Sequence, residues 1–428
     1  MNSFFDKLTE KMSGMMDKIE VFTENKYIKS IAAGMAAFVP FTVITGFAYI
    51  IAFVPITGYE TFIANIFGDY TAFMSYFVSF GNATMNLGSI ICCVYIAYFL
   101  AKEYNNKELV PIHVAVMAMA IYFFVSPIAA QGIGAFGTSY LFSGIIIAIV
   151  STEIYRFFIQ KHITIKLPPQ VPENVASSFT SLIPLAITIV VFSIINLLCA
   201  KTPYGDFMTM INALIATPFS KIGTSIWGYC IIETFVLILW FFGLHGNNIL
   251  WGILTPALMV NTDANRLAFL AGEPLPYILT NEFNVLAYAN VGMWTCITAI
   301  LFCKSVKLKT VGKVAVVPAI FRIDEPTNFG FPVMYNPIMW VPYFICNLGG
   351  IVLTYILTVL NIVPRTVGIA LTWTTPTLLS GYFLTNGSWI AVLWQLILGL
   401  LYMAIHIPFL KAYDKRCLAE EAAAAKNE

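Results

Sequence analysis

Long uncharged apolar runs constrain the fold of this chain more than any other feature. A helix needs about 20 predominantly apolar residues to cross a lipid bilayer. Runs of that length or more, without Asp, Glu, Lys or Arg, cover residues 31–59, 70–101, 109–152, 174–200, 234–262, 283–303, 326–364 and 366–410. They are continuously apolar and lack the alternation of an outer-membrane β-barrel, so they predict membrane-spanning helices.

The composition supports a membrane protein. Of 428 residues, 59% are hydrophobic and only 11% are charged, and the mean hydropathy is +0.81. This is too little charge to cover the surface of a soluble protein of this size. We therefore expect an all-α polytopic membrane protein embedded in a lipid bilayer, and we expect no nucleic-acid partner.

The distribution of Lys and Arg predicts the topology. Residues 1–30 alternate lysines with acids and indicate an amphipathic helix on the cytoplasmic surface of the membrane. Cytoplasmic connections carry excess positive charge, and residues 102–107, 156–166 and 304–313 fit that pattern. Counting between them predicts about ten transmembrane helices with both termini in the cytoplasm.

Two polar islands interrupt the apolar sequence. The first is Gly243–Asn248, in which two glycines flank His245, and the second is Arg322–Asn328, which contains Asp324 and Glu325. Polar and ionisable residues inside a membrane are expensive and usually functional. Prolines also break any continuous helix across residues 314–336, and interrupted helices are typical of transport sites. The islands are therefore the candidate site.

The sequence divides into two parts. Residues 1–205 carry regular spans, and residues 206–428 carry the interrupted spans and most of the buried polar residues, with Thr202–Gly205 as a hinge between them. The eight cysteines show no metal-ligand or redox spacing. No nucleotide-binding or zinc-protease motif is present, so we expect neither a metal nor a cofactor.

The islands resemble those of a known family. The GLHGNN run of Gly243–Asn248, the RIDEPTNFGFPVMYNP run of Arg322–Pro337 and the preceding Val316–Pro318 closely resemble the membrane component, IIC, of bacterial phosphotransferase sugar permeases of the lactose and cellobiose group. The resemblance covers essentially the whole chain. It implies a multi-pass protein of the bacterial cell membrane and a homodimer of ten-span subunits. Residues 1–205 would make the dimer contact, and residues 206–428 would hold a β-linked disaccharide between two re-entrant hairpins.

The resemblance also assigns the site residues. It implies that Glu325 and His245 meet the sugar near the hydroxyl that is phosphorylated, where they would act as catalytic groups. His245, Asn247, Asp324 and Glu325 would bind the substrate, and Trp373 would stack on a sugar ring. Asp324 stands where many relatives are expected to have asparagine, and it adds a second acid beside Glu325. From its position in an apolar run, Glu233 is a further substrate-binding candidate.

Each of these residues has a structural alternative. His245 could cap a helix, and Glu233 could form a packed structural pair inside its span. Arg322 could simply neutralise Asp324. Trp373 could be an ordinary interface anchor, because tryptophan is enriched at both membrane surfaces.

The resemblance implies a transporter coupled to phosphorylation. A sugar would bind from outside, and a cytoplasmic IIB protein carrying a phosphocysteine would phosphorylate it. Residues 411–428 are too short to be a IIB domain, so the donor is expected on a separate polypeptide. Two other classes stay open from the residues alone. One is a proton-coupled sugar symporter with Glu325 and Glu233 as its relay, and the other is a transferase acting on lipid-linked sugar.

Overall fold

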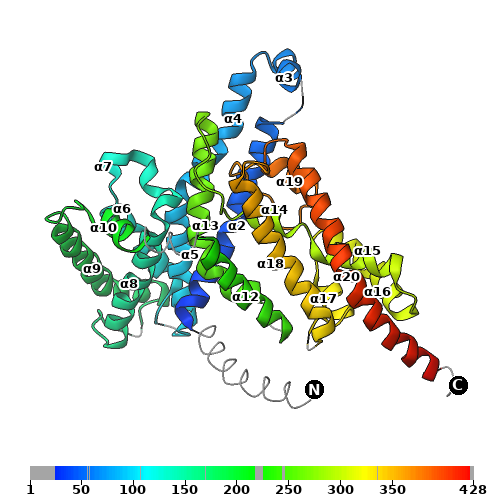
Figure 1. Ribbon diagram of the computed structural model, residues 1–428. Coiled ribbons are helices and arrows are strands. Elements are labelled where there is room, and N and C mark those ends of the chain that lie inside the picture. The colour runs from blue at the N-terminus through cyan, green and yellow to red at the C-terminus, as the bar shows by residue number, and fades with distance from the viewer. Residues whose placement is uncertain are drawn as a thin grey trace. The chain divides into compact units, whose positions relative to one another are not determined.

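A computed structural model describes residues 25–424, except 55, 57, 107, 169, 217–224, 243–245 and 335. The side chains of residues 173–177, 216, 248, 249, 252, 253, 325, 337 and 424 are also outside the description. The described part of the chain is helical and contains no strand (Figure 1). Its α-helices are α2 (Lys26–Ala52), α3 (Tyr59–Phe67), α4 (Tyr70–Ala83), α5 (Gly88–Glu103), α6 (Pro111–Val125), α7 (Ile128–Gln131), α8 (Leu141–Gln160), α9 (Glu173–Cys199), α10 (Phe207–Ile211), α12 (Ile226–Phe241), α13 (Gly246–Ala271), α14 (Phe283–Tyr288), α15 (Val291–Phe302), α16 (Val306–Ile320), α17 (Glu325–Gly330), α18 (Pro337–Val359), α19 (Leu379–Leu384) and α20 (Trp389–Ala424). Short helical segments η1 (Met85–Leu87), η2 (Gly132–Phe136), η3 (Thr138–Tyr140) and η4 (Asn212–Ala216) join some of them.

The helices agree with the predicted fold class. Within the described residues, seven helical segments are long and apolar enough to cross a membrane, and a pair bent by 67° between α6 and the segment after it could add an eighth. Helix α12 is a shorter apolar helix. The predicted count of about ten crossings is compatible with this set. The predicted surface helix falls mainly on residues 1–24, outside the described residues, while Lys26–Ser30 belong to α2.

Contacts divide the described residues into two compact units. Unit 1 takes residues 25–40, 83–216 and 251–256, and unit 2 takes residues 41–82, 225–250 and 257–424. The predicted division of roles between residues 1–205 and 206–428 stays a prediction.

Unit 1 is a bundle built around α5, α6, α8 and α9. Small residues let α5 and α8 approach closely, because a Cβ on Gly144 would lie 2.8 Å from the carbonyl oxygen of Ser89. The hydroxyl of Ser89 donates to the carbonyl of Tyr140 over 2.7 Å. Close approach at small residues and interhelical hydrogen bonds are the usual means of packing helices in lipid, where the hydrophobic effect does not drive association.

Unit 2 centres on α15, which packs against α16 and α20, while α18 packs against α12, α14 and α20. Figure 1 shows α18 and α20 side by side. Leu286, Trp294, Leu398 and Tyr402 are part of one buried apolar cluster in this unit. These helices carry the cavity described below.

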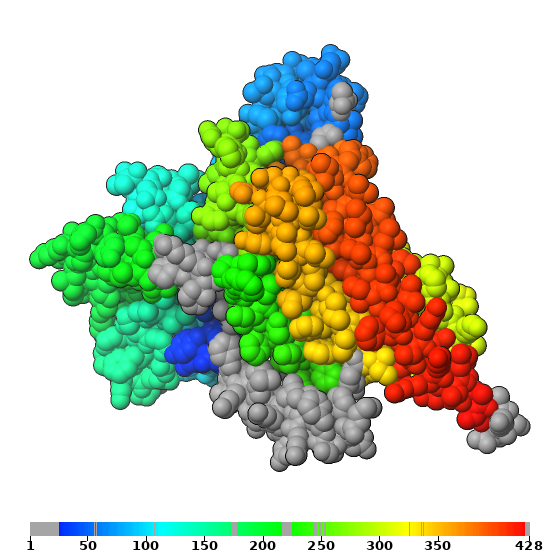
Figure 2. All heavy atoms as spheres, in the orientation of Figure 1, coloured from blue at the N-terminus to red at the C-terminus, as the bar shows by residue number. Residues whose placement is uncertain are grey.

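Helix α20 extends well beyond the apolar run that predicted it. It continues to Ala424, and its last turns project past α18 (Figure 2). The buried carboxylate of Asp414 explains part of this length, because it accepts hydrogen bonds from the backbone N–H groups of Lys304 and Ser305, each over 2.8 Å. Asp414 therefore satisfies free donors at the start of α16 and fixes α20 to the α15–α16 hairpin.

A polar stretch of α13 holds the extended segment 272–282. Asn261 donates to the carbonyl of Leu279 over 2.7 Å, and Asn265 exchanges two hydrogen bonds with the backbone of Tyr277. Thr262 donates to the carboxylate of Glu282 over 2.6 Å. Backbone without regular structure needs such partners when it is buried, so α13 supplies them from its side chains.

Glu282 gives this connection a pH dependence. The side chain is 3% exposed, and burial raises its pKa from 4.5 to about 7. A carboxyl group whose pKa rises on folding stabilises the folded protein while the group is protonated. This stabilisation is complete below the pKa of the group in the unfolded chain, and it is lost as the pH rises through the pKa of the group in the folded protein. This pKa shift corresponds to a change on the order of 3 kcal/mol in the free energy of unfolding.

We therefore expect Glu282→Gln, which cannot ionise, to melt at a higher temperature than the wild type at pH 8, with the difference disappearing by pH 5. Thermal melting in detergent from pH 5 to 8 measures this. Parallel pH profiles for the two proteins would contradict it. Glu273→Gln, at an exposed position in the same segment, is the matched control.

Candidate functional site

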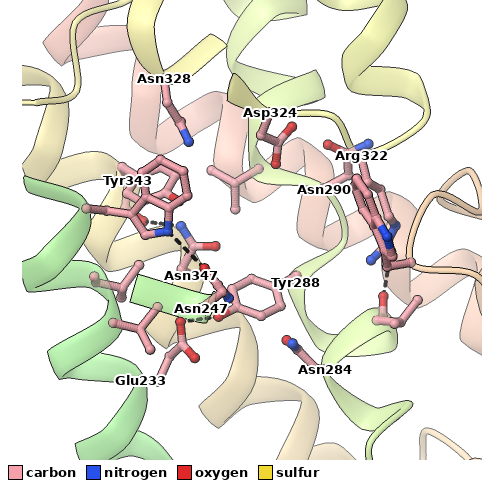
Figure 3. Close-up of a pocket in the computed structure, with 16 residues that line it drawn as sticks. Glu233, Asn247, Asn284, Tyr288, Asn290, Arg322, Asp324, Asn328, Tyr343 and Asn347 are labelled. Atoms are coloured by element: carbon pink, nitrogen blue, oxygen red, sulfur yellow. Dashed lines mark hydrogen bonds between the residues drawn. The ribbon is translucent and has the colours of Figure 1, made fainter. Parts of the chain in front are cut away.

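Unit 2 contains a cavity of about 520 Å³. Its polar lining consists of five asparagines, two carboxylates and one arginine, and aromatic side chains complete much of the remainder (Figure 3). The lining residues are Glu233, Val236, Leu237, Trp240, Asn247, Asn284, Val285, Tyr288, Asn290, Val291, Arg322, Asp324, Asn328, Tyr343, Asn347 and Trp373. They come from α12, the start of α13, α14, the α14–α15 and α16–α17 connections, the start of α15, α17, α18 and the loop after α18.

A break between α14 and α15 forms one wall. Ala289 and Asn290 both adopt positive φ, 42° and 62°, which ends α14 and turns the chain. The Asn290 side chain accepts a hydrogen bond from the backbone of Met293 over 3.1 Å, capping α15, and donates to the carbonyl of Ala319 over 2.6 Å. Asn290 thus fixes the broken span to α16. Irregular backbone at membrane depth is tolerated where it lines a cavity.

The turn after α16 brings Arg322 and Asp324 to the cavity. The backbone N–H of Arg322 donates to Ala319 and that of Ile323 donates to Pro318, over 2.8 and 3.1 Å. These two bonds form a Schellman motif, in which the residue after the C-cap is left-handed and is usually glycine. Here that residue is Arg322, with φ of 61°. A side chain at such a position costs roughly 1–2 kcal/mol, so the identity of this residue needs a reason beyond the turn.

The guanidinium of Arg322 is held on one side only. Its Nη2 donates to the carbonyl of Val285 over 2.6 Å, and the hydroxyls of Thr377 and Ser380 lie at 3.5 and 3.4 Å. Its Nε is buried and has no hydrogen-bond partner within the protein. The carboxylate of Asp324, which lines the same cavity, lies near enough to interact electrostatically with this guanidinium. An arginine side chain stays charged at neutral pH.

Glu233 lies on a different side of the cavity from Arg322 and Asp324 (Figure 3). It is 1% exposed, and its carboxylate accepts a hydrogen bond from the hydroxyl of Tyr288. Beside it, the indole N–H of Trp240 donates to the side-chain oxygen of Asn247 over 2.8 Å. Two separate hydrogen-bonded pairs thus present polar atoms to this end of the cavity.

Two asparagines that line the cavity have side-chain acceptors without a partner. The side-chain oxygens of Asn284 and Asn328 are buried and have no hydrogen-bond partner within the protein. Buried polar groups are nearly always satisfied, so these oxygens, together with Nε of Arg322, indicate a ligand that both donates and accepts hydrogen bonds.

The structure brings four of the six predicted site residues together. Glu233, Asn247, Asp324 and Trp373 all line the one cavity. His245 lies outside the described residues, and Glu325 begins α17 with a side chain that is not described. Trp373 is 57% exposed, as a residue at the cavity edge would be.

Sequence reasoning missed the further asparagines and tyrosines of the lining. Asn284, Asn290 and Asn347 each interrupt an apolar run, and this was the available signal. Within the described part of the chain, no group of three or more His, Cys, Asp or Glu is placed to hold a metal ion.

Comparison with known proteins gives a consistent result. The family model described as "Phosphotransferase system, EIIC" matches residues 32–346. The lichenan permease IIC component of Bacillus subtilis (strain 168) is 34% identical, over 98% of this chain and 96% of that protein. The cellobiose-specific EIIC component of Geobacillus stearothermophilus is 30% identical, over 99% of this chain and 97% of that protein.

A solved structure matches the whole fold. The crystal structure of the transporter ChbC, the IIC component from the N,N'-diacetylchitobiose-specific phosphotransferase system, superposes with a TM-score of 0.90. The two chains are 32% identical, and the match covers 98% of this chain and 99% of that one.

Proposed function

Because the chain belongs to the EIIC family of the phosphotransferase system, we propose that it imports a β-linked disaccharide that is phosphorylated as it enters the cell. The chain is a multi-pass membrane transporter component of that system, which works with a IIB partner. The matched proteins are phosphotransferase components, and they give no support to a proton-coupled symporter.

One observation supports a sugar as the substrate: polar atoms that line the cavity lack hydrogen-bond partners within the protein. Free acceptors on Asn284 and Asn328 and a free donor on Arg322 suit the hydroxyls of a sugar, which donate and accept at once. The volume of about 520 Å³ lies within the usual range for small-ligand sites. Trp373 at the edge supplies a flat apolar surface against which a sugar ring can stack.

Cellobiose and diacetylchitobiose are the first candidates. Related proteins are named for lichenan, cellobiose and diacetylchitobiose. All three names describe sugars joined by β-linkages, and a cavity lined by amides can accommodate either hydroxyl or acetamido substituents through hydrogen bonds.

Glu325 and His245 are proposed to act at the hydroxyl that receives the phosphoryl group. Glu325 lies next to Asp324 and three residues before Asn328, both of which line the cavity. Two residues beyond His245, Asn247 lines it as well. A carboxylate and an imidazole can orient and deprotonate a hydroxyl, which is the assistance that phosphoryl transfer needs besides charge neutralisation.

The donor is proposed to be a phosphocysteine on a separate IIB protein. We also propose that the chain forms a homodimer through spans before residue 205 in the bacterial cell membrane, with both termini cytoplasmic. Cysteine cross-linking in α5–α9 should trap the dimer, whereas trapping only from unit 2 would contradict it. Reporter fusions at both ends test the orientation.

A binding panel on the purified protein tests the substrate. We expect cellobiose or diacetylchitobiose to raise the melting temperature, because a ligand that binds the folded state stabilises it. The α-linked disaccharide maltose should have no effect at the same concentration. Stabilisation by maltose alone would contradict the proposed substrate class.

A further inference from the structure

Arg322 is the only Lys or Arg in the described lining of the cavity, and it lies beside a negative charge. Asp324 is its electrostatic neighbour, and Glu233 adds a second carboxylate to the lining. Sugar hydroxyls can be bound by amides and carboxylates without a cation. Bringing a phosphoryl group next to these acids costs electrostatic free energy unless a positive charge compensates for the repulsion.

Two features show that Arg322 is held for more than the turn it occupies. Its backbone is left-handed where glycine is the usual residue, and its Nε is buried without a partner. Only one strong hydrogen bond, to the carbonyl of Val285, anchors the guanidinium. Part of the planar donor set is therefore available, and this donor set matches the oxygens of a phosphate group.

We propose that Arg322 forms an anion subsite of the cavity that holds the phosphoryl group transferred to the sugar. This inference rests on the proposed function. In the transfer, the sulfur–phosphorus bond of the partner's phosphocysteine breaks and a bond forms between phosphorus and the sugar hydroxyl oxygen. The hydroxyl proton passes to a carboxylate of the site, and the cysteine leaves as thiolate. Arg322 binds the phosphoryl oxygens in that step and in the phosphorylated product.

Binding of sugar and phosphorylated sugar to the purified full chain tests this. The probes are cellobiose or diacetylchitobiose, whichever stabilises the wild type, and the same disaccharide phosphorylated on a primary hydroxyl. The variants are Arg322→Gln, which removes the charge, and Arg322→Lys, which keeps the charge but lacks the planar set of N–H donors of a guanidinium. Arg365→Gln is the matched control, because Arg365 also donates to a backbone carbonyl, that of Leu275, but does not line the cavity.

We expect Arg322→Gln to lower affinity for the phosphorylated sugar by about 10-fold to 100-fold, the worth of hydrogen bonds to a charged group, with a much smaller effect on the unmodified sugar. Arg322→Lys should recover part of the loss, and Arg365→Gln should affect neither ligand. If Arg322→Gln does not fold, the neutral variant Arg322→Met takes its place, and an unchanged preference for the phosphorylated sugar in that variant overturns the inference.

Two other outcomes would overturn the anion subsite. One is an equal loss of affinity for both ligands in Arg322→Gln. The other is a wild type that binds the sugar but does not bind the phosphorylated sugar. Equal losses would assign Arg322 to a structural role through Val285. If the wild type binds no disaccharide, the proposed function itself fails, and this outcome is distinct from the others.

Discussion

Replacing Glu325 with glutamine is expected to abolish sugar phosphorylation by the reconstituted system. Glutamine keeps the shape and one acceptor of glutamate but removes its charge and basicity, so a hydroxyl could still be bound but not deprotonated. Binding of the disaccharide should weaken by roughly 1.5–3 kcal/mol, the usual worth of a hydrogen bond to a charged group. Measuring sugar phosphate formed with a phosphorylated IIB partner checks the first effect, and calorimetry checks the second.

A matched substitution separates this effect from a general loss of carboxylate charge. Glu60→Gln changes an exposed acid of α3 that does not line the cavity, and it should phosphorylate sugar at the wild-type rate. Normal phosphorylation by Glu325→Gln would remove Glu325 from the catalytic role.

Replacing His245 with alanine is expected to abolish stabilisation by sugar without lowering stability in its absence. Gly243 and Gly246 flank this histidine, and Asn247 just beyond it lines the cavity. An imidazole that contacts ligand contributes to binding, and ligand raises the melting temperature only through binding. Melting curves with and without disaccharide measure both quantities.

A structural histidine would give the opposite pattern. His245→Ala would then melt at a lower temperature without sugar and still gain stability when sugar is added. His162→Ala, at an exposed turn after α8, serves as the control and should respond to sugar as the wild type does.

The apolar runs predicted most of the spans closely, because a continuously apolar segment that is long enough to cross the membrane can adopt few structures other than a spanning helix. The run 283–303 corresponds to a span over Phe283–Phe302. The break within it at Ala289 and Asn290 could not be predicted, since neither glycine nor proline marks it. It depends on Asn290 reaching Ala319 of α16, which is a tertiary contact.

The prolines did predict the interruption after α16, where the helix ends at Ile320 and α17 begins at Glu325. Helix α20 is longer than the apolar run 366–410 predicts, because hydrophobicity alone does not predict the charged turns after Leu410. Asp414 instead uses its charge to bind the start of α16. A sequence does not reveal this pairing across 109 residues or more.

The rarity of charge in apolar sequence was sufficient to select Glu233 and Asp324 as candidates, and the family resemblance selected Trp373; all three line the cavity. The same criterion did not select Asn284 or Asn347, since asparagine is also a common capping and turn residue. The importance of Arg322 depends on its left-handed backbone and unpartnered Nε, which only a structure reveals.

Uptake into proteoliposomes tests the central claim, that transport is coupled to phosphorylation, most directly. Vesicles holding the purified chain would receive radiolabelled disaccharide outside, with phosphorylated IIB protein inside or omitted. The account predicts that label accumulates only when phosphorylated IIB is present, and that the accumulated label is sugar phosphate. Accumulation of unmodified disaccharide without IIB, driven by a pH gradient, would contradict it.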